Sequence, residues 1–413
     1  MNILVLGNGF DLAHGLPTSY KDFLAFCKKI QTLYKYDEFI SQGEYKSKEI
    51  DSWKMNESIK ERIVNAYADR KINKCTDKEG MEHNISIDSI FDELYGYIQK
   101  NTWLEYFWNT PTYVGENWID FETEIAAVVK SLDVARSLLA YGDSILDLET
   151  KDSAIISTIL KASKGSLQHA FGGLQEIDKF IVFLVEELDK LIRVLEIYIN
   201  EFIGKIKIKK VSSDIVNVNA DHILSFNYSD TYERLYAVKE NIEYDYVHGK
   251  ADVKNVIASN NMVLGIEEYL KGDQKNEDIS FIAFKKFYQR IHKQTGCEYK
   301  RWIEKISVDE KKGRPWIMDN KDHSRDHRHN LYIFGHSLDI SDRDILREFI
   351  LHDNVDTTIF YYERIDENGV SDNGRTELGK KIANLVKVIG QEELIKRTGG
   401  STKTIDFKLQ QNM

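Results

Sequence analysis

Four short clusters of glycine, amide, imidazole and hydroxyl groups carry the chemistry that this sequence could perform. The first two are Gly7-Asn8-Gly9-Phe10-Asp11 and Ser225-Phe226-Asn227-Tyr228-Ser229-Asp230. The other two are Val247-His248-Gly249-Lys250 and Gly335-His336-Ser337-Leu338-Asp339. Closely spaced glycines let a backbone approach a phosphate, and an imidazole of near-neutral pKa can accept a proton. The clusters therefore predict a nucleotide site with acid–base chemistry.

Each cluster follows a short apolar run of the length of a buried strand. The runs are Ile3–Leu6, His222–Phe226, Tyr244–Val247 and Leu331–Phe334. In an open α/β sheet, ligands bind at the carboxyl ends of the strands, so we expect the clusters to meet at one edge. A helix that begins near Thr18, with a capping box of Ser19 and Asp22, would receive a pyrophosphate at its N-terminus.

The alternation of apolar runs with helical periodicity predicts the fold class. It indicates an α/β, Rossmann-like, mostly parallel sheet with helices on both faces, formed by residues 1–30 and 215–413, with a large helical insertion at 31–214. Further strands are expected at 262–264 and 357–362. Helices are expected near 230–238, 278–306, 341–351 and 374–388.

The insertion shows apolar residues at helical spacing. We expect helices at 90–98, from 117 onward, and from Leu174 to about Ile203 with a stop at Gly204. Trp118 and Phe121 are predicted core anchors. The long helix fits either an internal helical bundle or the interface of a homo-oligomer. The insertion as a whole would either sense a trigger or hold the oligomer together.

The composition excludes several classes of protein. The 413 residues carry a net charge of −11, which argues against a dedicated DNA-binding protein, so nucleic acid is not an expected partner. Only three cysteines occur, far apart, so a four-cysteine zinc site is excluded and a reducing, cytoplasmic setting is expected. No apolar run is long enough to cross a membrane, and no signal peptide is recognised.

Purely structural roles stay possible for several of these residues when each is considered alone. Asn227 alone is also typical of a turn, and His248 alone of a core histidine. Asp339, Asp342 and Asp344 are expected to cap the helix that follows them. The histidines between His323 and His329 fit either a metal site or a polar loop, and no metal is expected.

The clusters resemble, in the same chain order, the motifs of sirtuins and sirtuin-like NAD hydrolases. Gly7-x-Gly9 and Gly15-x-Pro17 resemble the loop G-A-G-x-S…G-I-P, and Ser225-x-Asn227-x-x-Asp230 resembles T-x-N-x-D. His248-Gly249 resembles the catalytic H-G, and Gly335-x-Ser337-Leu338 resembles G-x-S-L. The longer sequence stretches around these motifs, including Ser-Phe-Asn-Tyr and Phe-Gly-His-Ser-Leu-Asp, resemble more closely the AbiH family of phage abortive-infection proteins.

This resemblance implies an anti-phage effector that hydrolyses NAD to nicotinamide and ADP-ribose. It makes Asn227 and His248 the catalytic residues. The implied nucleotide-binding residues are Gly7, Asn8, Gly9, Phe10, Asp11, Gly15, Pro17, Ser225, Asp230, Gly249, Gly335, His336 and Ser337. Asp11 and Thr18-Ser19-Tyr20 depart from the sirtuin pattern, and the zinc cysteines are absent, which argues against protein deacetylation.

Two other functions stay open at this point. The same fold could bind NAD, ADP-ribose or a related nucleotide and signal to a partner without hydrolysis. A nuclease acting through the C-terminal aspartates and histidines is weaker, because the net charge is acidic and no metal-ligand spacing is recognisable.

Overall fold

The computed structural model describes residues 1–37, 52–65, 87–111, 113, 119–165, 171–237, 241–313, 327–365 and 369–411. Its contacts divide the chain into two compact units, each built from separate segments. The first unit comprises Met1–Leu16, Lys207–Lys250 and Gln294–Met413, and the second comprises Pro17–Ile206 and Ala251–Lys293. Residues 251–293, which the sequence prediction gave to the α/β domain, thus group with the helical unit.

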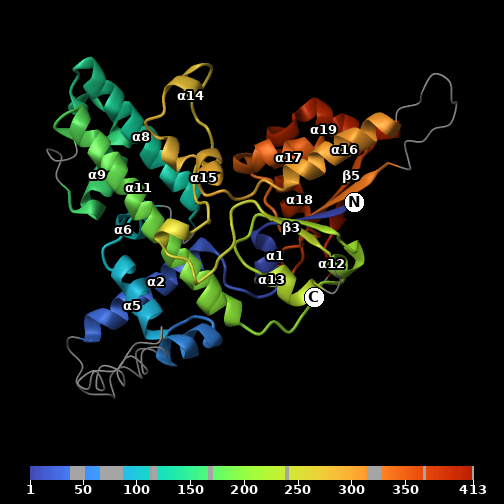
Figure 1. The fold of residues 1–413 in the computed structure, drawn as a ribbon, viewed down its shortest axis with the longest axis horizontal. Helices are drawn as coiled ribbons and strands as arrows, with labels where there is room; N and C mark the ends of the chain where they lie inside the picture. The colour runs from blue at the N-terminus through green and yellow to red at the C-terminus, as the bar shows by residue number, and fades with distance from the viewer. Residues whose placement is uncertain are drawn as a thin grey trace. The chain divides into compact units, whose positions relative to one another are not determined.

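A parallel sheet of six strands forms the first unit, in the order β3-β2-β1-β4-β5-β6 (Figure 1). Every neighbouring pair of strands is parallel, as the doubly wound fold requires. The strands are β1 (Asn2–Leu6), β2 (His222–Ser225), β3 (Glu243–Tyr246), β4 (His329–Phe334), β5 (Val355–Tyr361) and β6 (Ile405–Leu409). The strand order reverses at β1, so the crevice between β1 and β4 is the topological switch point where such folds bind ligands.

Helices cover both faces of this sheet, which confirms the predicted Rossmann-like architecture (Figure 1). Ile3 and Val5 of β1 belong to a core shared with helices on one face, and Leu4 and Leu6 belong to the core of the opposite face. The first set of helices is α16 (Tyr299–Gly313), α17 (Arg343–Ile350), α18 (Arg375–Ile389) and α19 (Gln391–Thr398). The second set is α1 (Asn8–Ala13), α12 (Ser213–Val218) and α13 (Thr231–Tyr236).

Two predicted elements of the C-terminal half are wrong. Residues 262–264 are buried but form no strand. The single helix expected over 278–306 is interrupted, because Gln294 and Gly296 both adopt left-handed backbone angles, with φ of 52° and 66°. The chain instead forms α15 (Lys286–His292) before the break and α16 after it.

The second unit is helical, and α11 is its longest helix. It packs against α5, α6 and α8, and the predicted run from Leu174 is confirmed, since α11 continues through a π-helical turn at Tyr198–Phe202. Phe121 is fully buried, as expected, whereas Trp118 lies outside the described residues. The helices are α2 (Tyr20–Asp37), α5 (Ile87–Ile98), α6 (Thr102–Trp108), α8 (Phe121–Tyr141), α9 (Thr150–Ser163), α11 (Leu174–Ile197), α14 (Gln274–Glu277) and α15.

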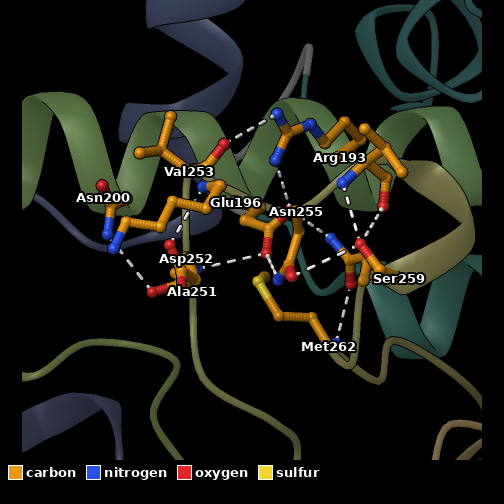
Figure 2. A network of polar contacts seen from close by, with 12 residues as sticks. Arg193, Glu196, Asn200, Ala251, Asp252, Val253, Asn255, Ser259 and Met262 are labelled. Atoms are coloured by element: carbon orange, nitrogen blue, oxygen red, sulfur yellow. Dashed lines mark hydrogen bonds and ion pairs between the residues drawn. The ribbon is translucent and has the colours of Figure 1, made fainter.

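A buried polar network fastens the segment from Ala251 to Met262 onto α11 (Figure 2). The Arg193 guanidinium donates to Glu196 over 2.7 Å and to the Val253 carbonyl oxygen over 3.2 Å. The fully buried Glu196 carboxylate also accepts hydrogen bonds from the side chains of Asn255 and Asn260, over 2.7 and 2.5 Å. Buried charges need such partners, so the network fixes the course of this segment within the second unit.

Among the described residues, no helix combines the length and the apolar character that crossing a membrane would require.

Candidate functional site

The loops that follow β1 and β4 are bonded to each other through their backbones at the switch point. Gly7 N–H donates to the Phe334 carbonyl oxygen over 3.2 Å, and Gly9 N–H donates to the Gly335 carbonyl oxygen over 2.8 Å. Phe10 N–H donates back to Gly7, because α1 begins directly after Gly7. The predicted phosphate loop is thus itself the first turn of a helix, and three of its amides already have partners within the protein.

This contact accounts for three of the predicted glycines. A Cβ on Gly335, whose φ is 70°, would lie 2.1 Å from the Phe10 nitrogen. A Cβ on Gly7 would lie 2.4 Å from the α-carbon of His336, and one on Gly9 would lie 2.7 Å from the Gly335 carbonyl oxygen. Such distances are shorter than any tolerable contact, so the packing of loop on loop requires glycine at all three positions.

Asn227, at the end of β2, reaches the glycine loop. Its side-chain nitrogen donates to the Gly7 carbonyl oxygen over 3.1 Å, and the residue is buried. The Ser225 hydroxyl donates to the Asn227 carbonyl oxygen and accepts from the Asn227 N–H, which fixes the turn between them. The structure therefore brings together three of the predicted site residues from β1 and β2.

His248, after β3, and His336, after β4, meet at the carboxylate of Asp342. His248 Nε2 lies 3.2 Å from Asp342 Oδ1, an ion-pair distance without the alignment of a hydrogen bond. His336 Nε2 lies 3.4 Å from Asp342 Oδ2, and all three side chains are buried. Asp342 stands at the N-cap position of α17, as predicted, but its side chain makes no capping hydrogen bond. Asp339 makes one instead, accepting from the Ser341 N–H.

An aromatic ring and a turn set the orientation of the two histidines. The Phe226 ring meets the His248 ring edge-to-face at 5.4 Å and the His336 ring at 4.4 Å. Gly249 has a φ of 79°, and its N–H donates to the Tyr246 carbonyl oxygen over 2.9 Å. The predicted Gly249 is thus needed for the turn that directs His248 towards Asp342.

Helix α18 supports the loop after β4 through two residues for which the sequence offered no signal. The Lys381 ammonium donates to the His336 carbonyl oxygen, and the Asn384 side chain donates to the Ser337 carbonyl oxygen over 3.0 Å. Burial lowers the pKa of Lys381 to about 8. Ser337 itself is exposed.

Asp11 lies on α1 and is almost completely buried. Its Oδ2 accepts a hydrogen bond from the Ser229 hydroxyl over 2.7 Å, while its Oδ1 has no hydrogen-bond partner among the described residues. Burial raises the pKa of Asp11 to about 6. Asp230, also predicted as a site residue, forms an ion pair with Arg234 over 3.0 Å on the surface of α13.

A narrow crevice, too tight to admit a water molecule, lies between the ends of β1 and β2. Its polar lining includes Ser225, Asn227 and Ser229, and its apolar walls include Phe10 and Tyr232. The cavity has no room for a nucleotide in this conformation, so a ligand here would have to displace a loop.

The predicted residues that follow the glycine loop in the sequence lie away from the contact between the β1 and β4 loops. Gly15, with a φ of 74°, follows α1 and is exposed. Pro17 belongs to the helical unit, where its carbonyl oxygen accepts from the Tyr198 hydroxyl. His14 is held between the Phe10 carbonyl oxygen and the Tyr236 hydroxyl, and burial lowers its pKa. The predicted capping contact is confirmed, since the Asp22 N–H donates to the Ser19 hydroxyl over 3.2 Å.

The described residues contain no group of three or more side chains arranged to hold a metal ion. Residues 323–326 of the predicted histidine cluster lie outside the described residues. His329 begins β4, and its Nε2 lies 3.4 Å from Asp309, while burial lowers its pKa to about 4.

Comparison with known proteins identifies the family. No curated protein and no solved structure matches the chain. The model of a family described as "Bacteriophage abortive infection AbiH" matches residues 3–362, a stretch that includes the four clusters and the site built around the β1–β4 crevice. On this match over most of its length, the chain belongs to the AbiH family of bacteriophage abortive-infection proteins.

Proposed function

We propose that this protein acts in abortive infection by consuming NAD. One water is added across the bond between nicotinamide and ribose, which releases nicotinamide, ADP-ribose and a proton. The observation that carries the proposal is the placement of His248, with Asp342 beside it at 3.2 Å, at the ligand-binding edge of a Rossmann-like sheet. The order of the motifs, which resembles that of sirtuin-like NAD hydrolases, supports it.

The residues have separate roles in this reaction. The glycosidic bond breaks through an oxocarbenium-like state, and nicotinamide leaves with the bonding electrons. His248 accepts the proton from the attacking water, and the Asp342 carboxylate stabilises the imidazolium that forms. Asn227, which the Gly7 carbonyl oxygen holds at the crevice, orients the ribose or the water.

The experiment measures NAD in cells that express the protein, before and after phage infection, for wild type and for His248→Gln and Asn227→Ala. We expect NAD to fall in infected cells that express the wild type, and in none that express the His248 or Asn227 variant. His292→Gln is the matched control, since His292 is exposed on α15, outside the proposed site, and this variant should behave as wild type. Abortive infection with unchanged NAD, or equal NAD loss in the His248 variant, would overturn the proposal.

A second candidate function is nucleotide binding without hydrolysis. It is favoured by the bond from Asn227 to Gly7, because this bond commits one of the two N–H donors of the amide to the protein and leaves fewer groups to act on a reacting ribose. Calorimetry with NAD and with ADP-ribose, together with chromatography of the products, separates the two candidates. Binding without nicotinamide release, in extract from infected cells, would support the second.

A further inference from the structure

We propose that this protein forms a symmetric homodimer in which strand β6 of one copy pairs, antiparallel, with β6 of a second copy. Strand β6 (Ile405–Leu409) is the last strand of the sheet and pairs with β5 alone. Such an edge strand presents backbone N–H and C=O groups that can bind another strand. Strand β5 separates this edge from the crevice between β1 and β4, so the inference goes beyond the proposed NAD reaction and does not depend on it.

The odd-numbered residues of β6 direct their backbone groups away from the sheet. At one end of the strand pair, the Thr357 N–H donates to the Thr404 carbonyl oxygen over 2.7 Å, and at the other end the Gln410 N–H donates to the Tyr361 carbonyl oxygen over 2.8 Å. Because the backbone groups of a strand alternate in direction, the even-numbered residues face β5 and the odd-numbered ones face away. In the part of the chain that the structure describes, no loop or helix is bonded to these outward groups. The outward-facing residues are Ile405, Phe407 and Leu409.

The opposite edge of the sheet, formed by β3, already has a neighbour. The Tyr246 carbonyl oxygen, at the end of β3, accepts a hydrogen bond from the Thr295 hydroxyl over 3.1 Å. A Cβ on Gly296 would lie 2.5 Å from the Val247 carbonyl oxygen, so the segment before α16 packs tightly against this strand end. The edge at β6 is therefore the better candidate for pairing with a second chain.

The charged side chains of β6 select one register of the proposed pairing. A twofold axis through Phe407 brings Asp406 of each copy opposite Lys408 of the other, which gives two pairs of opposite charge in the dimer. A shift by two residues is the smallest that keeps outward backbone groups facing each other. It would place either two Asp406 or two Lys408 side chains opposite each other, and like charges in that position destabilise a strand pair. Strand β6 is thus self-complementary in the register that uses its whole length.

Both charged side chains are accessible on one face of the sheet. The side chains of Asp406 and Lys408 are 63% and 48% exposed. Within the chain, Asp406 forms an ion pair with Lys403, and the Lys408 ammonium lies 3.1 Å from Asp214 of α12. A carboxylate can accept from more than one donor, and an ammonium has three, so these contacts do not exhaust either group. The dimer would continue them as a row of alternating charges.

The other face of β6 is apolar. Phe407 packs against the core beneath α17, α18 and α19 and stays half-buried, and Leu409 keeps 38% of its surface exposed. In the proposed register, Phe407 lies opposite its own copy and Leu409 lies opposite Ile405. Burial of these side chains on pairing adds a hydrophobic contribution to the backbone hydrogen bonds.

The test is sedimentation equilibrium of the full chain over a series of concentrations, with no NAD present. We expect the wild type to dimerise. Asp406→Lys and Lys408→Asp each place like charges opposite one another twice per dimer, so each variant alone should have a dissociation constant higher by about tenfold or more. An equal mixture of the two variants restores opposite charges at both positions and should form a heterodimer as stable as the wild-type dimer.

Lys403→Gln is the matched control, since it breaks the same ion pair within the chain as Asp406→Lys does but keeps Asp406 opposite Lys408. It should dimerise as the wild type does. Hydrogen exchange of the wild type requires no variant to fold, and the Phe407 and Leu409 amides should exchange more slowly as the concentration rises.

A wild-type chain that is monomeric at every concentration would overturn the proposal. The same conclusion would follow from equal dissociation constants for the wild type and both charge variants, or from a dimer in which the Phe407 and Leu409 amides are not protected. Because no NAD is used, the NAD assay and this test can fail independently of each other.

Discussion

Gly335 lies against Phe10 so closely that a Cβ on Gly335 would be 2.1 Å from the Phe10 nitrogen. This contact joins the loop after β4 to the first turn of α1. The φ of 70° at Gly335 adds a second reason for glycine. The Gly335→Ala variant should therefore lower the free energy of unfolding by about 3 kcal/mol or more, since it combines backbone strain with a clash against main-chain atoms.

Gly15→Ala is the matched control for this prediction. Gly15 has a similar φ of 74°, but an added Cβ would meet nothing within 4 Å. Its cost should be limited to the left-handed strain, about 1 kcal/mol. Urea unfolding of both variants measures the difference, and equal costs would show that the loop contact does not contribute.

Asp11 predicts a specific dependence of stability on pH. Burial raises its pKa from 3.8 to about 6 in the folded protein, so the unfolded chain ionises at a lower pH than the folded one. Stability should fall as the pH rises from about 4 to 6 and stay lower above that, by about 3 kcal/mol.

The Asp11→Asn variant removes this ionisation while keeping an oxygen for the Ser229 hydroxyl. Its stability relative to wild type should improve by about 3 kcal/mol between pH 4 and pH 7.5. Urea midpoints at the two pH values test this. A difference that does not change with pH would mean that folded Asp11 ionises in the ordinary range.

The Tyr236 hydroxyl should contribute to stability through two hydrogen bonds. It donates to His14 Nε2 over 2.6 Å, because the His14 Nδ1 hydrogen is used by the Phe10 carbonyl oxygen, and it accepts from the Ser212 N–H. Tyr236→Phe leaves both buried groups unsatisfied and should cost about 2–3 kcal/mol. Tyr141→Phe, at a residue that is 85% exposed, should leave the melting temperature unchanged. Equal melting temperatures of the two variants would contradict the prediction.

Glu196 should be among the most sensitive residues of the helical unit. Glu196→Ala leaves Arg193, the buried Asn260 and the half-buried Asn255 without this carboxylate and should cost about 3–5 kcal/mol. Asp178→Ala breaks an ion pair with Arg136 in which the Asp178 side chain is half exposed, and it should cost less than about 1 kcal/mol. Thermal unfolding compares them, and a small effect of Glu196→Ala would show that solvent enters the network.

The sheet could be predicted because each of its central strands is a short apolar run that ends in a turn. The edge strand β6, Ile405–Leu409, was not predicted, since its alternation of apolar and charged residues is short and weak. For residues 262–264 the error is the reverse, since a strand was predicted where none forms. They are as apolar as a strand, but they are buried in the helical unit without pairing to the sheet.

The site was predicted only in part, because local patterns do not show which loops meet. The rule that ligands bind at strand ends predicts that Asn227 and Gly7 lie close together. In the structure, the Asn227 side-chain nitrogen lies 3.1 Å from the Gly7 carbonyl oxygen. The contact of Asp342 with the two histidines could not be predicted, because an aspartate that precedes a helix is usually interpreted as its N-cap residue. Only the placement of β3 and β4 on either side of the central strands gives Asp342 its two histidine neighbours.

The pairing of β1 also determines when the crevice can form during synthesis of the chain. The central strand β1 is synthesised long before its partners, because Ile3 pairs with His222, and Asn2 pairs with Asn330. Contacts so distant in sequence form late. The crevice therefore does not exist until β4 has been translated, and a nascent or truncated chain that ends before β4 lacks it altogether.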